Sequence, residues 1–434
     1  MTLDHNQWAE LMQQLPALTA ADGEWRLTAR HWTGSLRLEA DDDAWVATID
    51  DGVVTGIGSA APAPAPTPDI EPGHVTVGAP LATWAGMLAA DPEPFFHDPW
   101  AAVFQGLQWT GHPETQAQTA AAVRRLVELL RAAANPQRDW SPGDRAESAR
   151  AAAAARFDRT VGRYVHLELD GDDHRVYFEE AGRADGVPLL LQHTAGADGR
   201  QWRHILEDEE LGRRFRMIAY DLPYHGKSVP PTGKAWWTEE YRLTKAFLMS
   251  VPVALADALE LDRPVFMGSS IGGHLAVDLA FHHPDRFRAV IGIEAAMKQQ
   301  EADLTLLWHP RVSNEYKAMM MYGLTSPTSP EALRRETAFV YSQGAPPTFK
   351  GDLYYWQTDH DLSRDARHID INRCAVHLLT GEYDWATPPA LSEALAAEIP
   401  GATFEVMRGL GHFPMSEDPQ RFLEYVRPVL EKIQ

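Results

Sequence analysis

Three residues have the types and the order along the chain that nucleophilic catalysis requires: a serine, then an acid, then a histidine. Ser270 is the central residue of "GSSIG", residues 268–272, which matches the pattern G-x-S-x-G. This pattern fits a serine on a sharp turn between a strand and a helix, because the flanking glycines leave room for the turn. The same small residues could also form a tight turn that has no catalytic role. The rest of the sequence must distinguish these two interpretations.

The acid and the base follow in the order expected for such a serine. Asp384 lies in "LLTGEYDWATP" and His412 lies in "VMRGLGHFPMSEDP", each just after a predicted strand. His412 would act as the general base, and Asp384 would fix its tautomer and stabilise the imidazolium. Glu294, in "IGIEAAM", is a rival acid at the end of an earlier strand. We expect Asp384 to be the acid.

Two backbone N–H groups are candidates for stabilising an oxyanion. Ile271 begins the helix after the serine, so its N–H and the positive end of the helix dipole would face the developing charge. The loop "LLLQHTAGADGRQW" follows a predicted strand over 187–192 and should supply the second donor. Ala195 is the first choice for this donor and Thr194 is the second.

The elements that must position these residues are short strands alternating with helices. From about residue 161, apolar runs such as "VPLLLQ", "FRMIAYD", "PVFMGSS", "AVIGIEA" and "CAVHLLTG" are typical of buried strands in a mostly parallel sheet. Helical segments lie between them, which predicts a doubly wound α/β fold. Parallel strands end at one edge of the sheet, so Ser270, Asp384 and His412 should meet there. Residues 296–371 lack a buried-strand signal and predict an inserted cap.

Taken together, these residues resemble the α/β-hydrolase superfamily over about residues 161–434. The segment "YDLPYHGKS" resembles the turn that members carry after the fourth strand. The sequence departs from the family pattern at Thr194, where most members have glycine after the histidine. It also departs at His225 and Gly226, where a glycine pair is commoner.

The resemblance implies chemistry through an acyl-enzyme, because the turn carries Ser270 and not the aspartate of haloalkane dehalogenases and epoxide hydrolases. We expect a serine hydrolase that cleaves a carboxylic ester or a lactone without a cofactor. The alternatives are a carbon–carbon bond hydrolase, an acyltransferase with the same three residues, or a lipid-binding protein without catalysis.

The cap predicts the character of the substrate. It is rich in aromatic residues and methionine, which form adaptable apolar walls. A bulky apolar ester or lactone is therefore the expected substrate. The residues expected to line its pocket are Trp308, Tyr316, Met319, Met320, Tyr322 and Trp356 in the cap, with Trp236 in a neighbouring loop.

Residues 1–134 predict a separate small α+β domain, joined by a linker over 135–160. Strand-like runs extend from Trp25 to Ile57, beginning with "WRLTARHW", and helical patterns follow at 80–90 and 115–134. This order of strands and helices, with "GLQWTG" before a helix, resembles the sterol-carrier-protein fold. The resemblance implies binding of an apolar ligand, substrate delivery or dimer formation. We favour a structural or oligomerisation role, with a homodimer as one candidate state.

Composition excludes several classes of function. The 434 residues carry 39 Lys and Arg against 61 Asp and Glu, a net charge of −22, which argues against binding to nucleic acid. The single cysteine, Cys374, excludes an internal disulfide and a cysteine-rich zinc site, and no metal site is expected. The N-terminal residues lack a signal-peptide pattern and no apolar run reaches the ~18 residues of a membrane span, so a cytoplasmic protein without membrane insertion is expected.

Overall fold

The computed structural model describes residues 3–61, 71–140, 157–300 and 302–433. The chain forms two compact units: residues 1–143 with 305–323, and residues 144–304 with 324–434. Residues 141–156 of the expected linker lie outside the described residues. Among the described residues, no helix is both long and apolar enough to cross a membrane.

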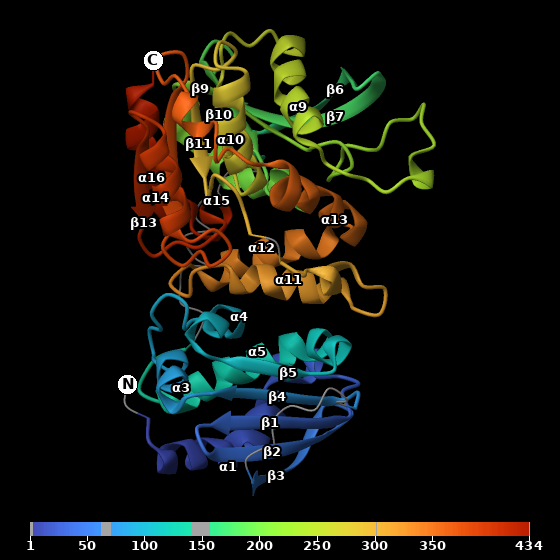
Figure 1. The fold of residues 1–434 in the computed structure, drawn as a ribbon, viewed down its shortest axis with the longest axis vertical. Helices are drawn as coiled ribbons and strands as arrows, with labels where there is room; N and C mark the ends of the chain where they lie inside the picture. Colours follow the sequence, from blue (N-terminus) through green and yellow to red (C-terminus); the bar gives the residue numbers. More distant parts are fainter. Residues whose placement is uncertain (1–2, 62–70, 141–156, 301, 434) are drawn as a thin grey trace. The chain divides into compact units, whose positions relative to one another are not determined.

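The N-terminal unit is a mixed sheet with helices (Figure 1). Its strands run in the order β3-β2-β1-β4-β5, with β1 and β4 parallel and the other pairs antiparallel. Its elements are α1 (His5–Ala21), α2 (Gly23–Thr28), β1 (Gly34–Ala40), β2 (Asp43–Asp50), β3 (Val53–Ala60), β4 (His74–Ala79), α3 (Leu81–Met87), α4 (Pro99–Ala102), η1 (Val103–Gln105), β5 (Gln108–Gly111), α5 (Pro113–Ala134), η4 (Thr305–Trp308) and α11 (Asn314–Gly323).

The core of this unit fills the space between the sheet and helices α1, α3 and α5. Trp8, Trp84 and Met12 are fully buried in it, and the rings of Trp8 and Trp84 lie 4.9 Å apart. The expected strand over "WRLTARHW" is wrong for its first part, which is helix α2. The Asp22 side chain accepts a hydrogen bond from the Trp25 N–H and so caps the start of this helix.

The second unit is a doubly wound α/β fold with a mostly parallel sheet of eight strands, in the order β13-β12-β11-β10-β8-β9-β7-β6. Only β7 runs antiparallel, to both β6 and β9. Its strands are β6 (Val161–Leu169), β7 (Asp172–Gly182), β8 (Val187–Gln192), β9 (Phe215–Tyr220), β10 (Val265–Ser269), β11 (Ala289–Ile293), β12 (Ala375–Gly381) and β13 (Thr403–Met407).

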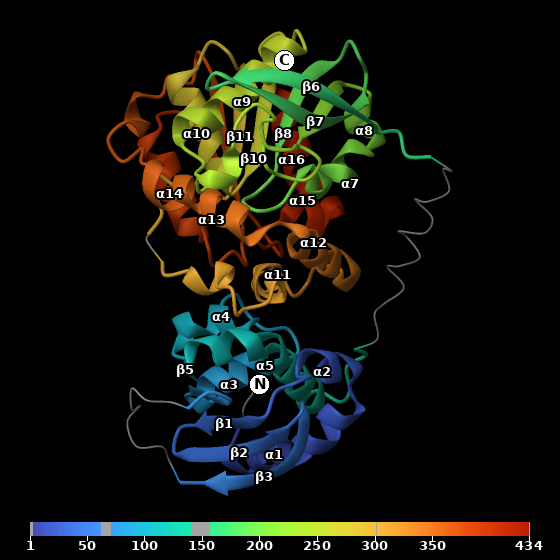
Figure 2. The same cartoon turned by 90° about the vertical axis from the view of Figure 1, so that its right-hand side faces the viewer.

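Helices cover both faces of this sheet, as Figure 2 shows. Helices α9, α10 and α14 lie on one face, and α7, α8 and α16 lie on the other and share an apolar core with the strands. The helices of this unit are η2 (Gly199–Trp202), α7 (Arg203–Leu206), α8 (Glu209–Gly212), η3 (Trp236–Thr238), α9 (Lys245–Ala258), α10 (Ile271–His282), α12 (Glu331–Gln343), α13 (Pro346–Tyr354), η5 (Tyr355–Asp359), η6 (Ala366–His368), α14 (Pro389–Glu398), α15 (Pro414–Glu417) and α16 (Pro419–Lys432).

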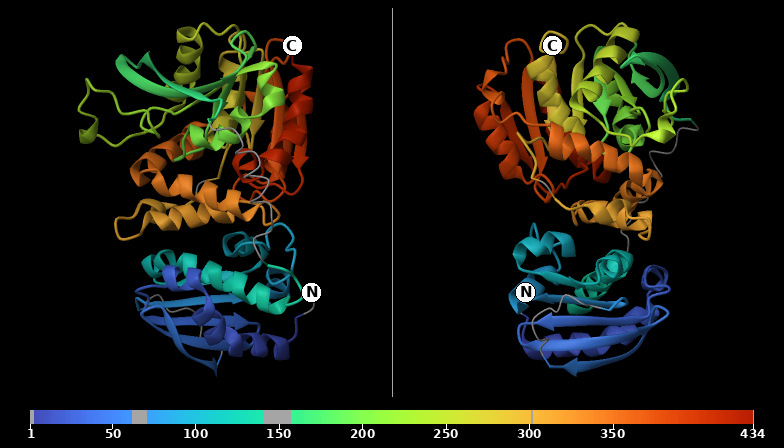
Figure 3. Two further views of the ribbon diagram at one scale, coloured as in Figure 1. Left: turned by 180° about the vertical axis from the view of Figure 1, so that it is seen from behind. Right: turned by 45° about the vertical axis from the view of Figure 1, so that its right-hand side comes forward.

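The sequence predicted each of the five central strands at the place where the structure has it. Every residue of β10 and β11 is buried, which is why these strands read as unbroken apolar runs. The long insertion between β11 and β12 is mainly helical, yellow to orange in Figure 3. Its segment 305–323 belongs to the N-terminal unit, whereas α12 and α13 belong to the second unit.

Candidate active site

Ser270 lies at the junction of β10 and α10 in a strained backbone conformation, with φ 57° and ψ −113°. A non-glycine residue rarely adopts such a positive φ, and strain of this kind is common at functional sites. The Ser270 N–H donates to the Ile293 carbonyl oxygen at 2.9 Å, which holds the turn against β11. A Cβ at Gly268 would lie only 2.5 Å from the Gly272 carbonyl oxygen, so this turn requires glycine there.

His412 and Asp384 come together in a direct hydrogen bond. The His412 Nδ1 donates to Asp384 Oδ2 at 2.7 Å, and both side chains are buried. The other carboxylate oxygen of Asp384 accepts from the N–H groups of Ala386 and Thr387, at 2.8 and 3.0 Å. With Nδ1 donating, Nε2 of the neutral imidazole carries the lone pair and can accept a proton.

The histidine loop lies next to the serine turn. The Ser269 Oγ is 3.5 Å from the His412 carbonyl oxygen and donates to Glu294 Oε2 at 2.9 Å. On the other side, the His412 N–H donates to the Leu324 carbonyl oxygen at 3.0 Å. The turn that carries Ser270 therefore contacts the loop that carries His412 through the Ser269 side chain.

Glu294, the rival acid, has a different environment from Asp384. It is completely buried, its Oε2 accepts from Ser269, and its Oε1 lies 3.4 Å from the Gly381 N–H. Burial, reinforced by the nearby negative charge of Asp384, raises the pKa of Glu294 well above its ordinary value. Asp384 bonds His412 Nδ1 directly whereas Glu294 bonds Ser269, so this geometry favours Asp384 as the partner of His412.

The loop after β8 carries two candidate N–H groups, and one of them has no hydrogen-bond acceptor among the described residues. The Thr194 N–H donates to Gln201 Oε1 at 3.0 Å, which corrects the expectation that Thr194 could serve as an oxyanion donor. In contrast, the N–H groups of Ala195 and Ile271 meet no acceptor among the residues that the structure describes. Ala195 and Ile271 are the two donors that this arrangement leaves available.

His193 orients the peptide group that carries the Ala195 N–H. Its Nδ1 donates to the Thr194 carbonyl oxygen at 2.8 Å, and its Nε2 accepts from the Leu222 N–H at 3.0 Å. Burial, followed by the charge of His225, lowers the pKa of His193 to about 4, so the ring is neutral as these bonds require. Because a peptide group is planar, fixing the Thr194 oxygen also fixes the direction of the Ala195 N–H.

The residues expected to line the substrate pocket are divided between the two units. The Tyr316 ring packs against Trp100 with centroids 6.0 Å apart, and Arg124 lies 3.9 Å over the Tyr322 ring, all within the N-terminal unit. Trp308, Met319 and Met320 belong to that unit too, so five of the expected pocket residues lie in a different unit from Ser270.

The remaining two expected pocket residues belong to the second unit. The Trp356 ring lies 6.4 Å from that of His274, whose Nδ1 donates to the Ser270 carbonyl oxygen at 2.7 Å. Trp356 is therefore the expected pocket residue that is linked to the turn of Ser270, through His274. Trp236 is partly exposed beside Tyr224 and Trp237.

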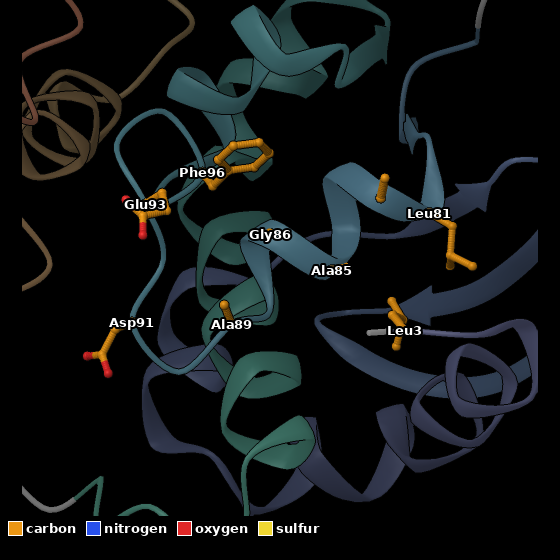
Figure 4. Close-up of a pocket in the computed structure, with 9 residues that line it drawn as sticks. Leu3, Leu81, Ala85, Gly86, Ala89, Asp91, Glu93 and Phe96 are labelled. Atoms are coloured by element: carbon orange, nitrogen blue, oxygen red, sulfur yellow. The ribbon is translucent and has the colours of Figure 1, made fainter. Parts of the chain in front are cut away.

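A pocket of about 600 Å³ lies in the N-terminal unit beside α3, as Figure 4 shows. Small apolar residues such as Ala85 and Ala89 and the acids Asp91 and Glu93 line it, and none of the expected catalytic residues does. Within the described parts of the chain, no three His, Cys, Asp or Glu side chains are grouped so that they could hold a metal ion.

Sequence reasoning missed the side chains that hold the loop after β8. Gln201 binds Thr194, and Asp352 accepts a 2.7 Å hydrogen bond from the Gly196 N–H. Gln201 lay within the quoted loop segment, but nothing distinguishes its side chain from a surface amide. Asp352 lies in the insertion, far along the chain from Gly196, and no motif marks it.

Comparisons with known proteins identify the family of this fold. Residues 189–425 match a family described as the alpha/beta hydrolase family. The 3-oxoadipate enol-lactonase 2 of Acinetobacter baylyi is 25% identical over 281 residues, covering 61% of this chain and 96% of that protein. The 2-hydroxy-6-oxo-2,4-heptadienoate hydrolase of Pseudomonas putida is 26% identical, covering 56% of this chain and 89% of the relative.

A solved structure gives a similar match. The thermophilic esterase from Thermogutta terrifontis superposes with a TM-score of 0.54 at 22% identity, covering 62% of this chain and 99% of the esterase. At this identity the likeness shows the fold of the second unit.

Proposed function

The chain belongs to the α/β hydrolase family, and on that premise we propose that it is a serine hydrolase that cleaves a carboxylic ester or a lactone. Ser270 is the nucleophile, His412 is the general base, and Asp384 orients His412. The observation that carries the proposal is the strained backbone of Ser270 on a turn that contacts the histidine loop at Ser269, together with the His412–Asp384 hydrogen bond. The lactonase name of the Acinetobacter relative supports this class of bond.

The proposed reaction proceeds in two halves. The Ser270 Oγ attacks the acyl carbon as its proton moves to His412 Nε2, and the electron pair of the carbonyl moves onto its oxygen. That oxyanion accepts from the N–H groups of Ile271 and Ala195. The tetrahedral intermediate then expels the alcohol oxygen, which takes the proton from His412. Water repeats the sequence on the acyl-enzyme and releases the acid.

Carbon–carbon bond hydrolysis is the second candidate. It is supported by the similarity to a Pseudomonas putida hydrolase named for a 2-hydroxy-6-oxo-2,4-heptadienoate substrate. In that reaction the same serine would attack a ketone, and the leaving group would be a carbon acid that must be protonated. A bulky apolar substrate stays part of the proposal, but among the insertion's residues it now rests on Trp356 near His274.

For the N-terminal unit we infer a structural role. The space between its sheet and helices is filled by buried side chains, including Trp8, Trp25 and Trp84. The same unit binds residues 305–323 of the insertion through Tyr316, Tyr322 and the ion pair between Arg311 and Glu114. Anchoring this segment is a role that requires no ligand.

The test is a panel of aryl esters, lactones and a vinylogous diketone, combined with labelling by a fluorophosphonate. Wild-type protein should hydrolyse an ester or a lactone and carry the label on Ser270. Ser270→Ala should lose both activity and label, whereas Ser269→Ala, the matched control on the same turn, should still be labelled. Activity that survives in Ser270→Ala would refute the proposal, and turnover of the diketone alone would favour the second candidate.

A further inference from the structure

Asp352, on helix α13 of the insertion, is buried against the loop that carries Ala195. Its Oδ2 accepts from the Gly196 N–H and from His225 Nε2, each at 2.7 Å. Its Oδ1 accepts from the Tyr241 hydroxyl at 3.3 Å. Asp352 is 0% exposed, and a buried carboxylate needs partners of this kind.

This arrangement favours the protonated form of His225. Its second ring nitrogen, Nδ1, lies 2.9 Å from the Pro223 carbonyl oxygen, which can only accept a hydrogen bond. His225 therefore donates from both nitrogens, as a protonated imidazole does. Burial alone would lower the pKa of His225, but the Asp352 carboxylate outweighs this and raises it above the ordinary value.

The pair acts on the oxyanion loop at two points. Asp352 directly holds the Gly196 N–H, and His225 lies beside His193, with ring centroids 5.0 Å apart. Burial, reinforced by the positive charge of His225, lowers the pKa of His193, which leaves His193 able to accept from Leu222 while it donates to Thr194. The Gly196 N–H and the Thr194 carbonyl group lie on either side of Ala195. Both are therefore held in place with the help of one buried ion pair.

Helix α13 also contacts this loop through an aromatic ring. Gly196 has φ +63°, and a Cβ there would lie 2.5 Å from the Phe349 ring. Phe349 and Asp352 lie three residues apart on α13, so they face the same side of the helix. The loop conformation is therefore set by a helix of the insertion, in addition to the sheet from which the loop emerges.

We propose that Asp352 and His225 are positioning residues for the oxyanion hole, so that helix α13 of the insertion contributes to the hydrolysis of the substrate. This inference rests on the proposed function, since it assigns the Ala195 N–H to the oxyanion. The competing explanation is that the pair only anchors α13 to the sheet. The two differ in kinetics, because an oxyanion donor acts mainly in the transition state and lowers kcat more than it changes KM when it is lost.

The experiment compares Asp352→Asn and His225→Gln with wild type on an ester that the protein hydrolyses. Loss of an oxyanion donor lowers kcat by about 10²- to 10³-fold, and a misaligned donor should still cost about tenfold or more. We expect that loss of kcat in both variants, with KM within about twofold of wild type. Amide hydrogen exchange at Ala195 and Gly196 should be faster in both variants.

Two control variants isolate the effect. Tyr241→Phe removes the third hydrogen bond to Asp352 and leaves Gly196 and His225 in place. Glu336→Gln breaks the ion pair between α12 and Arg203, another attachment of the insertion. Neither control should lower kcat by more than about twofold, since neither touches the peptide group that carries the oxyanion donor.

Several outcomes would overturn the inference. They are an unchanged kcat in the two pair variants, a rise in KM alone, or a matching loss of kcat in Glu336→Gln. If Asp352→Asn does not fold, His225→Gln carries the same test. If wild type hydrolyses neither an ester nor a lactone, or Ser270→Ala stays active, the proposed function fails instead. The exchange rates at Ala195 and Gly196 then still report whether the ion pair fixes the loop, and unchanged rates would refute it.

Discussion

The Nδ1 of His412 lies 2.7 Å from Oδ2 of Asp384, and the second oxygen of that carboxylate is occupied by two backbone N–H groups. These two bonds hold the Asp384 carboxylate in place independently of its bond to the imidazole. Glu294, at the other position where this kind of fold can carry an acid, is engaged by Ser269. Because the two acids differ in this way, substitutions at Asp384 and at Glu294 should have unequal effects on kcat.

Asp384→Asn should reduce kcat by about 10⁴-fold, because the amide favours the wrong imidazole tautomer and cannot stabilise the imidazolium. Glu294→Gln should have a much smaller effect, since Glu294 bonds Ser269 and not His412. Steady-state kinetics of both variants on one ester check this. The reverse order of effects would move the role of acid to Glu294.

The serine turn should not tolerate a side chain at Gly268. A Cβ there meets the Gly272 carbonyl oxygen at 2.5 Å, and forced overpacking costs about 1–3 kcal/mol. Gly268→Ala should lower the melting temperature and slow fluorophosphonate labelling of Ser270. Gly58→Ala is the matched control, since a Cβ at Gly58 has open space. Normal labelling of Gly268→Ala would show that the strained turn is not needed for reactivity.

Glu417 should make stability depend on pH. It is fully buried, and its Oε1 accepts from the Gly411 N–H, next to His412, and lies 3.4 Å from the Ser326 N–H. Burial raises the pKa of Glu417 to about 8 from an unfolded value near 4.5. Between these values the unfolded chain releases a proton that the folded protein keeps, so stability falls as pH rises.

The slope is at most about 1.4 kcal/mol per pH unit, and the loss is complete above pH 8. Glu417→Gln cannot ionise, so it should lose less stability than wild type between pH 5 and pH 8. Melting temperatures at the two pH values check this, with the exposed Glu424→Gln on α16 as the control. Equal losses in wild type and Glu417→Gln would contradict the prediction.

The aromatic residues of the insertion should separate into stabilising and substrate-contacting groups. Tyr322 is 1% exposed and lies under Arg124 in the N-terminal unit, so Tyr322→Ala should cost about 3 kcal/mol of stability, as large buried truncations do. It should leave KM unchanged. Trp356→Ala, near His274 in the second unit, should instead raise KM. A higher KM in Tyr322→Ala would restore the original expectation for that residue.

Much of the second unit could be predicted because its central strands are buried on both faces. Such strands read as short apolar runs, and the runs at 187–192, 265–269 and 289–293 are strands β8, β10 and β11. The N-terminal unit was harder, since its strands are only partly buried. Helix α1 has a capping box at Asp4 and Gln7 that could have been recognised, and α2 begins at an aspartate cap.

The sequence composition of the insertion could not predict which of its residues join the N-terminal unit. An aromatic residue looks the same in the sequence whether it lines a pocket or packs against a neighbouring domain. Tyr316 meets Trp100 because the chain returns to the N-terminal unit at residues 305–323. That return rests on contacts between residues far apart in the chain, and no local pattern encodes it.

By itself, the sequence determined the α/β fold and the candidate residues Ser270, Asp384 and His412, because local patterns specify strands, turns and the order of strand ends. The tertiary structure decided which acid pairs with His412 and which N–H groups are available to an oxyanion. It also revealed the ion pair of Asp352 and His225 beneath the loop. These are contacts between residues far apart in the chain, and their geometry exists only once the chain is packed.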